Sequence, residues 1–452
     1  MAHILCVTSG LAGMLHASFE VVSRLEAAGH RVTYLSTAPV REAVEAQGFT
    51  YVQLPLFDPE ALTRELPPAG SVWRRGLRRV GRWTGRSALL QAGIEALDLD
   101  EHVRVLQSLD PDLIVADMEV HESILAAYQL DIPVVLLSAW FSTWQADNLP
   151  HIRTDTIPGE GADGQPREMQ QAWRRAERKT RRRRLRQRLR GNVERGDVLA
   201  YYAKQIGFPR GELQWASFPP PFLYRTLPVL SMTLPALEFP HTPRPGLRYV
   251  GPMVYAERTD TRSDTATEER VDEVIRLSRE TGKPLVYCTV SSMDPGDTAF
   301  LKKLVSVFAE RQDWLLVLGL GGNVERSEFE PLPDNVFAFS WIPQLRILAG
   351  ADVSINHGGI HTINECIHFG VPMLIYSGKR YDQDGCAARV AYHGFGLRGD
   401  KDRDGAHDIE QKLEYILTDT GIRDTVHRAR EAYLHARKNE PLDGLDAYLA
   451  QL

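Results

Sequence analysis

The stretch "ADVSINHGGIHTINECIHFGVPMLIY", residues 351–376, decides the fold. "ADVSIN" has the apolar character of a buried strand, and "IHTINECIHFG" has helical spacing that ends at Gly370, just before another short apolar run. His357, Gly358 and Gly359 are therefore expected to form the turn between a strand and a helix. Strand, glycine turn, helix and strand in this order predict one unit of a parallel sheet that is covered by helices.

The same turn raises the question of a metal site, because His357, His361 and Glu365 are spaced four residues apart. On one continuous helix these three side chains would share a face. The predicted turn separates His357 from the other two, and glycine inside a helix costs about 1 kcal/mol relative to alanine. The sequence also lacks an HExxH motif. A zinc site is thus the weaker alternative. We favour a diphosphate site, faced by main-chain N–H groups and the positive end of the helix dipole.

Two series of alternating strand and helix patterns surround this stretch. The first series has strands at "HILCVT" (3–8), "RVTYLS" (31–36), "PDLIVAD" (111–117) and "IPVVLLS" (132–138), and the second runs from "GKPLVYCTV" (282–290) to "GVPMLIY" (370–376). A proline-rich segment without a strand pattern, 150–245, lies between them. We expect an α/β protein with two parallel-sheet halves, whose ligands bind beyond the carboxyl ends of the strands.

The composition is that of a soluble globular protein. A chain of 452 residues is too long for a single hydrophobic core of ordinary size, so we expect two or three domains. The net charge of −6 does not indicate a nucleic-acid partner. Four cysteines without CxxC spacing argue against a disulfide framework. The start, "MAHILCVTSG", is typical of a strand and not of a signal peptide, and no apolar stretch is long enough for a membrane span. We expect a cytoplasmic protein.

Three segments near the decisive stretch carry a resemblance to a known family. "WIPQLRIL" (341–348), "NHGGIHTINECIHFGVPML" (356–374) and "YDQDGCAARV" (381–390) follow one another at the order and spacing of the donor-binding signature of the UDP-glycosyltransferase superfamily. "KPLVYCTVSSM" (283–293) resembles the first strand and phosphate loop of its C-terminal domain. "RYVGP" (248–252) resembles its linker strand, and "AAGHRVTYLS" (27–36) its second N-terminal strand.

The resemblance implies the GT-B fold, in which two Rossmann-like domains face each other across a cleft. We expect an acceptor-binding domain at 1–240, with a basic helical insert at about 150–215, and a donor-binding domain at 241–430. A C-terminal helix at 431–452 would pack back on the N-terminal domain. The implied activity is inverting, metal-independent transfer of a sugar from a nucleotide-diphosphate sugar to a hydroxyl of a small lipophilic or aromatic acceptor, with no cofactor. UDP-glucose is the favoured donor and a dTDP-sugar the alternative.

The resemblance also implies roles for donor-site residues. Trp341 would stack on the nucleobase, while Gln344 and Glu365 would bind the ribose. The diphosphate would be held by a second group, namely Ser291, Ser292, His357, Gly359 and Thr362. Asp382 and Gln383 would hydrogen-bond the sugar. His361 stands where many plant members have Asn and is expected to add a donor to phosphate. Helix capping is the structural alternative for Asp382 and Gln383, and core packing is the alternative for Trp341.

The catalytic base is harder to assign. The family places a His in the turn after the first strand, and the alignment puts Met14 at this position, with His16 two residues later. Two residues turn a helical side chain by about 200°. His16 would therefore point away from the cleft if the helix has begun by residue 14, and could line it if the helix begins near residue 16. We expect His16 to be the base, oriented by Asp117. His121 is the reserve candidate, and Glu119 a weaker one.

Aromatic and basic segments suggest how an acceptor could be bound. "SAWFSTW" (138–144) follows a strand, so that Phe141 and Trp144, together with His121, are expected to line an acceptor pocket. Core packing is an equal alternative for each aromatic side chain. "WRRGLRRVGRWTGR" (73–86) has the pattern of an interfacial helix, and 174–190 carries eleven basic side chains against one acidic. Peripheral contact with an anionic membrane is a further expectation from these two segments, and a solvated helix is the alternative for 174–190.

Two other functions remain open at this point. One is a nucleotide-sugar-binding homologue without transfer activity, suggested by Met14 at the expected base position. The other is a GT-B-fold sugar epimerase. Hydrolysis of a nucleotide sugar or transfer to an acceptor would separate an enzyme from a binding protein.

Overall fold

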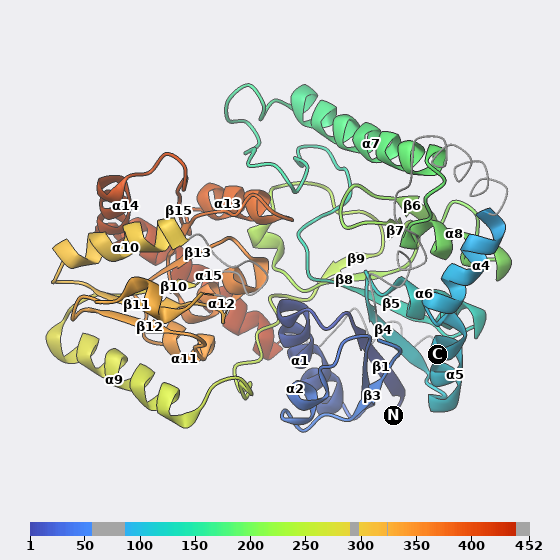
Figure 1. Cartoon of the computed structure of the whole chain (residues 1–452), viewed down its shortest axis with the longest axis horizontal. Coiled ribbons are helices and arrows are strands. Elements are labelled where there is room, and N and C mark those ends of the chain that lie inside the picture. The colour runs from blue at the N-terminus through green and yellow to red at the C-terminus, as the bar shows by residue number, and fades with distance from the viewer. Residues whose placement is uncertain (57–85, 290–297, 323, 440–452) are drawn as a thin grey trace, which may run out of the picture.

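The computed structural model of the chain describes residues 1–56, 86–289, 298–322 and 324–439. Two parallel sheets form the cores of two domains that lie side by side (Figure 1). The predicted α/β class with two Rossmann-like domains is confirmed. Each strand predicted in the two series is present, and its bounds differ from the prediction by at most three residues.

The N-terminal domain contains a sheet of seven parallel strands in the order β3-β2-β1-β4-β5-β8-β9. These strands are β1 (His3–Thr8), β2 (Arg31–Ser36), β3 (Tyr51–Gln53), β4 (Leu113–Asp117), β5 (Val134–Ser138), β8 (Val229–Ser231) and β9 (Leu247–Tyr249). Its helices include α1 (Ala12–Ala27), α2 (Arg41–Glu45), α4 (Arg86–Ala96), α5 (Leu99–Leu109), α6 (His121–Gln129) and α8 (Arg195–Gln205). The strand order reverses between β1 and β4, which is where a ligand crevice opens in such sheets.

The segment 150–245 departs from the expectation of a strand-free connection, which was wrong. It contains the long helix α7 (Pro166–Leu189), an antiparallel pair formed by β6 (Leu213–Trp215) and β7 (Phe222–Tyr224), and β8 of the first sheet. Strands of three residues carry too few apolar side chains to show in a sequence pattern. Because β9 pairs with β8, the first sheet extends beyond residue 240, the boundary that the sequence suggested.

The C-terminal domain contains six parallel strands in the order β12-β11-β10-β13-β14-β15. These are β10 (Leu285–Thr289), β11 (Leu315–Gly319), β12 (Val336–Phe339), β13 (Val353–Asn356), β14 (Met373–Ile375) and β15 (Gly396–Arg398). The helices of this domain include α9 (Thr265–Thr281), α10 (Thr298–Glu310), α11 (Gln344–Leu348), α12 (Ile360–Phe369), α13 (Gln383–Tyr392), α14 (Ala406–Thr418) and α15 (Thr420–Asn439). Helix α15 begins earlier than the helix expected at 431–452 and packs against α12, where Arg430 donates a hydrogen bond to the His368 carbonyl at 2.9 Å. Residues 440–452 lie outside the described part of the chain.

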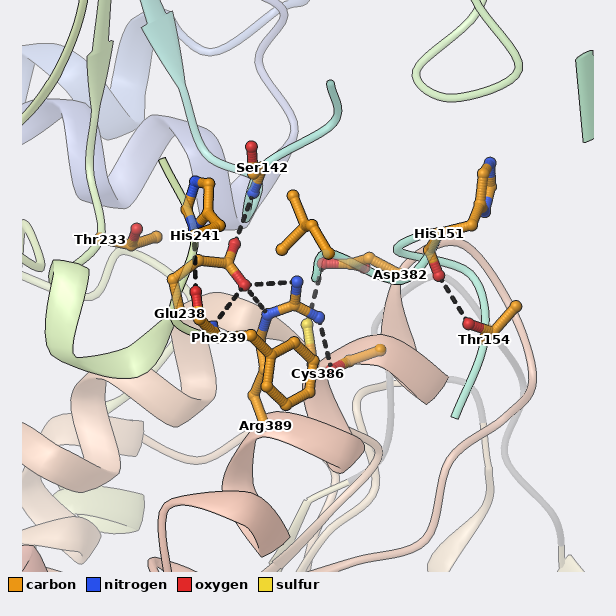
Figure 2. Close-up of polar contacts among 12 residues, drawn as sticks. Ser142, His151, Thr154, Thr233, Glu238, Phe239, His241, Asp382, Cys386 and Arg389 are labelled. Atoms are coloured by element: carbon orange, nitrogen blue, oxygen red, sulfur yellow. Dashed lines mark hydrogen bonds and ion pairs between the residues drawn. The ribbon is translucent and has the colours of Figure 1, made fainter. Parts of the chain in front are cut away.

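A buried ion pair joins the two domains. Arg389 of α13 donates to the carboxylate of Glu238, which lies between β8 and β9, and both side chains are almost fully buried (Figure 2). The rings of Phe141 and Phe239 flank the guanidinium at 4.7 and 4.5 Å. Glu238 also accepts the main-chain N–H of Ser142 at 2.8 Å. The N-terminal domain is thereby attached to the last turn of α13.

The described helices include none that is both long and apolar enough to cross a bilayer.

Candidate active site

The glycine turn forms as the sequence predicts, and steric contacts explain why glycine occupies it. Gly358 has φ +85°, and its N–H donates to the Asn356 side chain at 2.9 Å. A Cβ at Gly358 would lie 3.0 Å from the main-chain oxygen of Gln383, and one at Gly359 would lie 2.7 Å from Nε2 of His357. Glycine therefore lets α13 and the imidazole of His357 approach the turn. The first N–H groups of α12 are left without a side-chain cap, which is the arrangement that suits an anion.

The metal interpretation does not suit this geometry. His357 precedes α12, whereas His361 and Glu365 lie on it, so the three do not share a helix face. The Glu365 carboxylate is bound by Arg258 at 3.0 Å and by the amide of Gln344. Across residues 1–56, 86–289, 298–322 and 324–439, no three His, Cys, Asp or Glu side chains are grouped as metal ligands would be.

A cavity of about 260 Å³ lies between the two domains, at the carboxyl ends of β1, β4, β10 and β13. It brings together most of the residues that the sequence singled out, from both halves of the chain. Those in its lining are His16, Asp117, Trp341, Gln344, His357, Gly359, His361, Thr362, Glu365, Asp382 and Gln383. The predicted Ser291 and Ser292 lie outside the described residues.

One end of the cavity carries the groups expected to bind a nucleoside. The indole N–H of Trp341 donates to both carboxylate oxygens of Asp260, at 3.2 and 3.1 Å. The Tyr287 hydroxyl donates to Gln344 at 3.2 Å, and the amide of Gln344 in turn donates to Glu365. These bonds fix the orientation of the Gln344 amide and place the Glu365 carboxylate at the cavity wall.

The start of α13 forms the part of the lining where the sugar is expected. Asp382 is the N-cap residue of α13, but its side chain makes no capping hydrogen bond and instead accepts the thiol of Cys386 at 3.1 Å (Figure 2). Burial raises the pKa of Asp382 to about 6. The side-chain oxygen of Gln383 accepts the N–H of Gly378 at 2.9 Å. Asp382 is thus a buried carboxyl group that faces the cavity, and simple helix capping does not explain it.

His361, which the resemblance leaves unexplained, lies at the contact between the domains. A Cβ at Gly13 of α1 would come within 2.4 Å of the imidazole Cδ2 of His361, so the ring rests on the Gly13 main chain. Burial, together with the positive charge of Arg258, lowers the pKa of His361 to about 4. The ring is therefore neutral at pH 7 and can donate one N–H to a ligand without bringing a charge.

His16 also faces the cavity, although helix α1 has begun by Ala12. The expectation that so early a start would turn His16 away was wrong. Gly13, His16 and Ala17 are spaced three and four residues apart, so they share the face of α1 that meets the cavity. Burial lowers the pKa of His16 well below its usual value, and the charge of Arg258 adds to this. A neutral imidazole at pH 7 can accept a proton.

The structure does not join His16 and Asp117 as a hydrogen-bonded dyad. Both line the cavity, but the Asp117 carboxylate accepts the main-chain N–H groups of Ser9 at 3.3 Å and Glu119 at 3.1 Å, and among the described residues no hydrogen bond joins it to His16. Asp117 thus ties the loop after β1 to the end of β4. Glu119 lies beside it in the cavity lining, and burial together with the nearby Asp117 raises the pKa of Glu119 to about 8.

The residues expected to bind the acceptor occupy other places. Phe141 is buried against Arg389, as described above, and Trp144 packs on the core of the first domain with Arg244 over its ring at 4.7 Å. His121 is buried and shares a hydrogen bond of 2.9 Å with the Tyr224 hydroxyl. Burial lowers the pKa of His121 to about 3. From the "SAWFSTW" segment it is Trp140 that lines the cavity.

Sequence reasoning missed a group of lining residues on the segment that connects the domains. Met253, Val254, Tyr255, Arg258 and Asp260 follow β9 and precede α9, and they form one wall of the cavity. This segment has neither helical nor strand periodicity, so no pattern marks it. Its position directly after "RYVGP", at the crossing between the domains, was the available signal.

Comparisons with known proteins agree with this architecture. Residues 309–441 match the family model of the C-terminal domain of proteins like erythromycin biosynthesis protein CIII. The chain is 27% identical to oleandomycin glycosyltransferase of Streptomyces antibioticus, over 82% of this chain and 74% of that protein. It is 22% identical to zeaxanthin glucosyltransferase of Pantoea ananas, over 96% and 92% of the two chains.

Solved structures agree in fold. The glycosyltransferase of kitacinnamycin superposes with a TM-score of 0.66 at 21% identity, covering 100% of this chain and 99% of that one. The glycosyltransferase VinC, solved in complex with dTDP, superposes with a TM-score of 0.58 at 17% identity, covering 99% and 98%. The family match over residues 309–441, the related glycosyltransferases and the GT-B fold together support a member of the UDP-glycosyltransferase superfamily of the bacterial natural-product type.

Proposed function

We propose that the protein transfers a hexose, with inversion, from a nucleotide-diphosphate sugar to a hydroxyl group of a small lipophilic or aromatic acceptor. One observation carries this proposal above the others. The cavity between the domains is lined by residues of one domain that we expect to bind the nucleoside, the diphosphate and the sugar, and by His16 of the other domain. Such an arrangement holds two substrates in one place, so that their reaction becomes effectively unimolecular.

The proposed chemistry uses groups that the cavity already presents. His16 takes the proton of the acceptor hydroxyl while its oxygen attacks the anomeric carbon from the side of the N-terminal domain. The bond from that carbon to the diphosphate breaks, and the diphosphate leaves with the electron pair. The main-chain N–H groups at the start of α12 and the side chains of His357 and Thr362 face the developing negative charge. No metal takes part in this proposal.

UDP-glucose is our first choice of donor, because Gln344 and Glu365 lie together where two ribose hydroxyls can be bound. A dTDP-sugar is the alternative, and the solved complex of VinC with dTDP and that of the rhamnosyltransferase SpnG with thymidine diphosphate favour it. A thermal-shift screen with UDP, dTDP, UDP-glucose and dTDP-glucose compares the two bases directly. We expect the two uridine ligands and the two thymidine ligands to differ in how much they raise the melting temperature, since ligands that bind only the folded state stabilise it.

The acceptor is proposed from the apolar part of the cavity wall. Trp140, Met253 and Tyr255 line the cavity on the side of the N-terminal domain, together with Ala139 and Leu11. A lipophilic or aromatic hydroxylated acceptor fits such a wall, and two relatives are named as transferases for oleandomycin and zeaxanthin. Incubation with a donor and a panel of hydroxylated aromatic and macrocyclic compounds tests this directly. A chain that binds donor but neither hydrolyses nor transfers it would be the binding homologue instead.

A second interaction is proposed for the basic helix α7. Arg175, Lys179 and Arg186 lie on the side of α7 that forms a groove with His151 and Ser217, so that several cationic side chains face one hollow. We propose that this region contacts an anionic membrane surface, aided by segment 73–86. Of that segment only Arg86 lies within the described residues. Sedimentation with anionic and with neutral vesicles at low salt tests it. Equal recovery in the supernatant with both kinds of vesicle would reject membrane contact.

A further inference from the structure

The lining of the cavity contains many carboxyl groups and few basic side chains. Five carboxyl groups face it, those of Asp117, Glu119, Asp260, Glu365 and Asp382. Among the described lining residues Arg258 is the only Lys or Arg, and the sequence of 290–297 contains neither. His16 and His361 are neutral at pH 7, as their lowered pKa values indicate. Arg258 is thus the described lining residue whose side chain is a permanent cation, and Arg262 lies nearby, over the Trp341 ring at 4.7 Å.

The position of Arg258 suits the binding of a diphosphate. Its side chain is 7% exposed, and its Nη1 donates to Glu365 at 3.0 Å. Glu365 lies one helical turn after His361 on α12, and the charge of Arg258 acts on His361 as well. The guanidinium therefore lies beside Glu365, where the ribose is expected, and its charge also acts on His361 in the first turn of α12. We expect it to be near the phosphate that is attached to the ribose.

Arg258 also retains hydrogen-bonding capacity. A guanidinium has five N–H donors. Among the contacts of the described residues, its only hydrogen bond goes to Glu365, which leaves four donors for a ligand in the cavity. Arginine binds phosphate through two parallel N–H groups, and these bonds are stronger than those between neutral groups.

The N-terminal domain holds this arginine in place. The side-chain amide of Gln47, just after α2, accepts the N–H of Thr259 and donates to the Thr259 carbonyl, both at 2.9 Å. On the other side of the segment, Asp260 accepts the Trp341 indole N–H at 3.2 and 3.1 Å. Thr259 is thus bound by one domain and Asp260 by the other, with Arg258 next to both.

We infer that Arg258 is a donor-binding residue supplied by the segment between the domains, which binds the diphosphate of the nucleotide sugar, and that Gln47 is the positioning residue that holds it there. The inference rests on the proposed function. It adds a fixed cation to the site and makes donor binding depend on a contact made by the N-terminal domain.

Calorimetric titration of UDP, dTDP, uridine and thymidine into the unaltered chain and three variants tests the inference. Arg258→Gln removes the charge but keeps an amide donor, and it should weaken binding of the better diphosphate about 10- to 100-fold. Binding of the matching nucleoside should change less than about 3-fold, because a nucleoside carries no phosphate. Arg258→Lys should recover most of the lost affinity. Glu257→Ala, at an exposed neighbouring position, is the control and should bind like the unaltered chain.

Two results would overturn the inference. If Arg258→Gln binds the diphosphate as well as the unaltered chain does, Arg258 does not contact phosphate. If nucleoside and diphosphate lose affinity equally, Arg258 only orients Glu365. Failure of the unaltered chain to bind either diphosphate would instead refute the proposed function, so the two failures are distinguishable.

Gln47→Ala tests the positioning role separately. Gln47 lies outside the cavity lining and reaches it through the Thr259 contact. Its side-chain amide also donates to the Ala43 carbonyl at 3.0 Å, within the N-terminal domain. We expect diphosphate affinity to fall about 3- to 10-fold, with a chain that stays folded and a melting temperature lowered by the lost hydrogen bonds. Nucleoside affinity should change less than diphosphate affinity, which a general loss of stability would not produce. Unchanged diphosphate affinity would show that Gln47 does not position Arg258.

Discussion

At the scale of single residues, His16 is the group on which the proposed chemistry depends. Its imidazole faces the cavity from α1 and is neutral at pH 7, since burial and the charge of Arg258 lower its pKa. His16→Ala should reduce turnover by about 10²- to 10⁴-fold, the usual contribution of a general base, and leave donor affinity nearly unchanged. Steady-state rates and a UDP or dTDP titration on the same preparation measure both quantities. Retained turnover would show that His16 is not the base and that another side chain accepts the proton.

Asp382 gives a prediction about pH. Burial raises its pKa to about 6, so the carboxylate that would accept sugar hydroxyls is present above pH 6 and is protonated as the pH falls through that value. The donor KM should therefore rise as the pH is lowered from 7 to 5. In Asp382→Asn, which has no titrating group at this position, the KM should be higher at pH 7 and vary much less. An identical pH profile in the variant would contradict this assignment.

At the scale of elements, the contact between α1 and α12 sets the distance across the cavity. The His361 ring rests on Gly13, where an added Cβ would lie 2.4 Å away. Gly13→Ala should therefore force the helices apart and destabilise the protein by about 1–3 kcal/mol, as overpacking generally does. The double variant Gly13→Ala/His361→Ala removes the clash and should recover part of this loss. Thermal melting of both variants measures the effect, and independent, additive losses would argue against the contact.

The elements also show what the sequence could predict and why. The unit of β13, the glycine turn and α12 was predictable because two of its positions have a backbone conformation that favours glycine. Gly358 adopts φ +85°, and Gly370 ends α12 at φ +77°. Candidate donor-site residues could be proposed from such local patterns, and the described ones line one cavity. The acceptor side could not, because alternate side chains of one short segment point in different directions. Trp140 faces the cavity while its neighbour Phe141 packs on Arg389, and no periodicity distinguishes them.

At the scale of the whole molecule, the ion pair between Glu238 and Arg389 supports the relative placement of the domains. The two side chains are 1% and 2% exposed, and loss of one partner leaves a buried charge without compensation. Glu238→Gln should lower the free energy of unfolding by about 3–5 kcal/mol. The exposed pair of Arg270 and Glu273 provides the matched control, because Arg270→Gln should cost less than about 1 kcal/mol. Urea denaturation of both variants compares them, and equal losses would contradict the role of the buried pair.

Transfer across the cavity between the domains is the central claim, and the stereochemistry of the product tests it most directly. The purified protein is incubated with UDP-glucose or dTDP-glucose, whose sugar is α-linked, and a hydroxylated aromatic acceptor, and the product is examined by proton NMR. We predict a β-linked glucoside together with one equivalent of released nucleoside diphosphate. An α-linked product, or acceptor and donor both unchanged although the nucleotide is bound, would contradict the proposed inverting transfer.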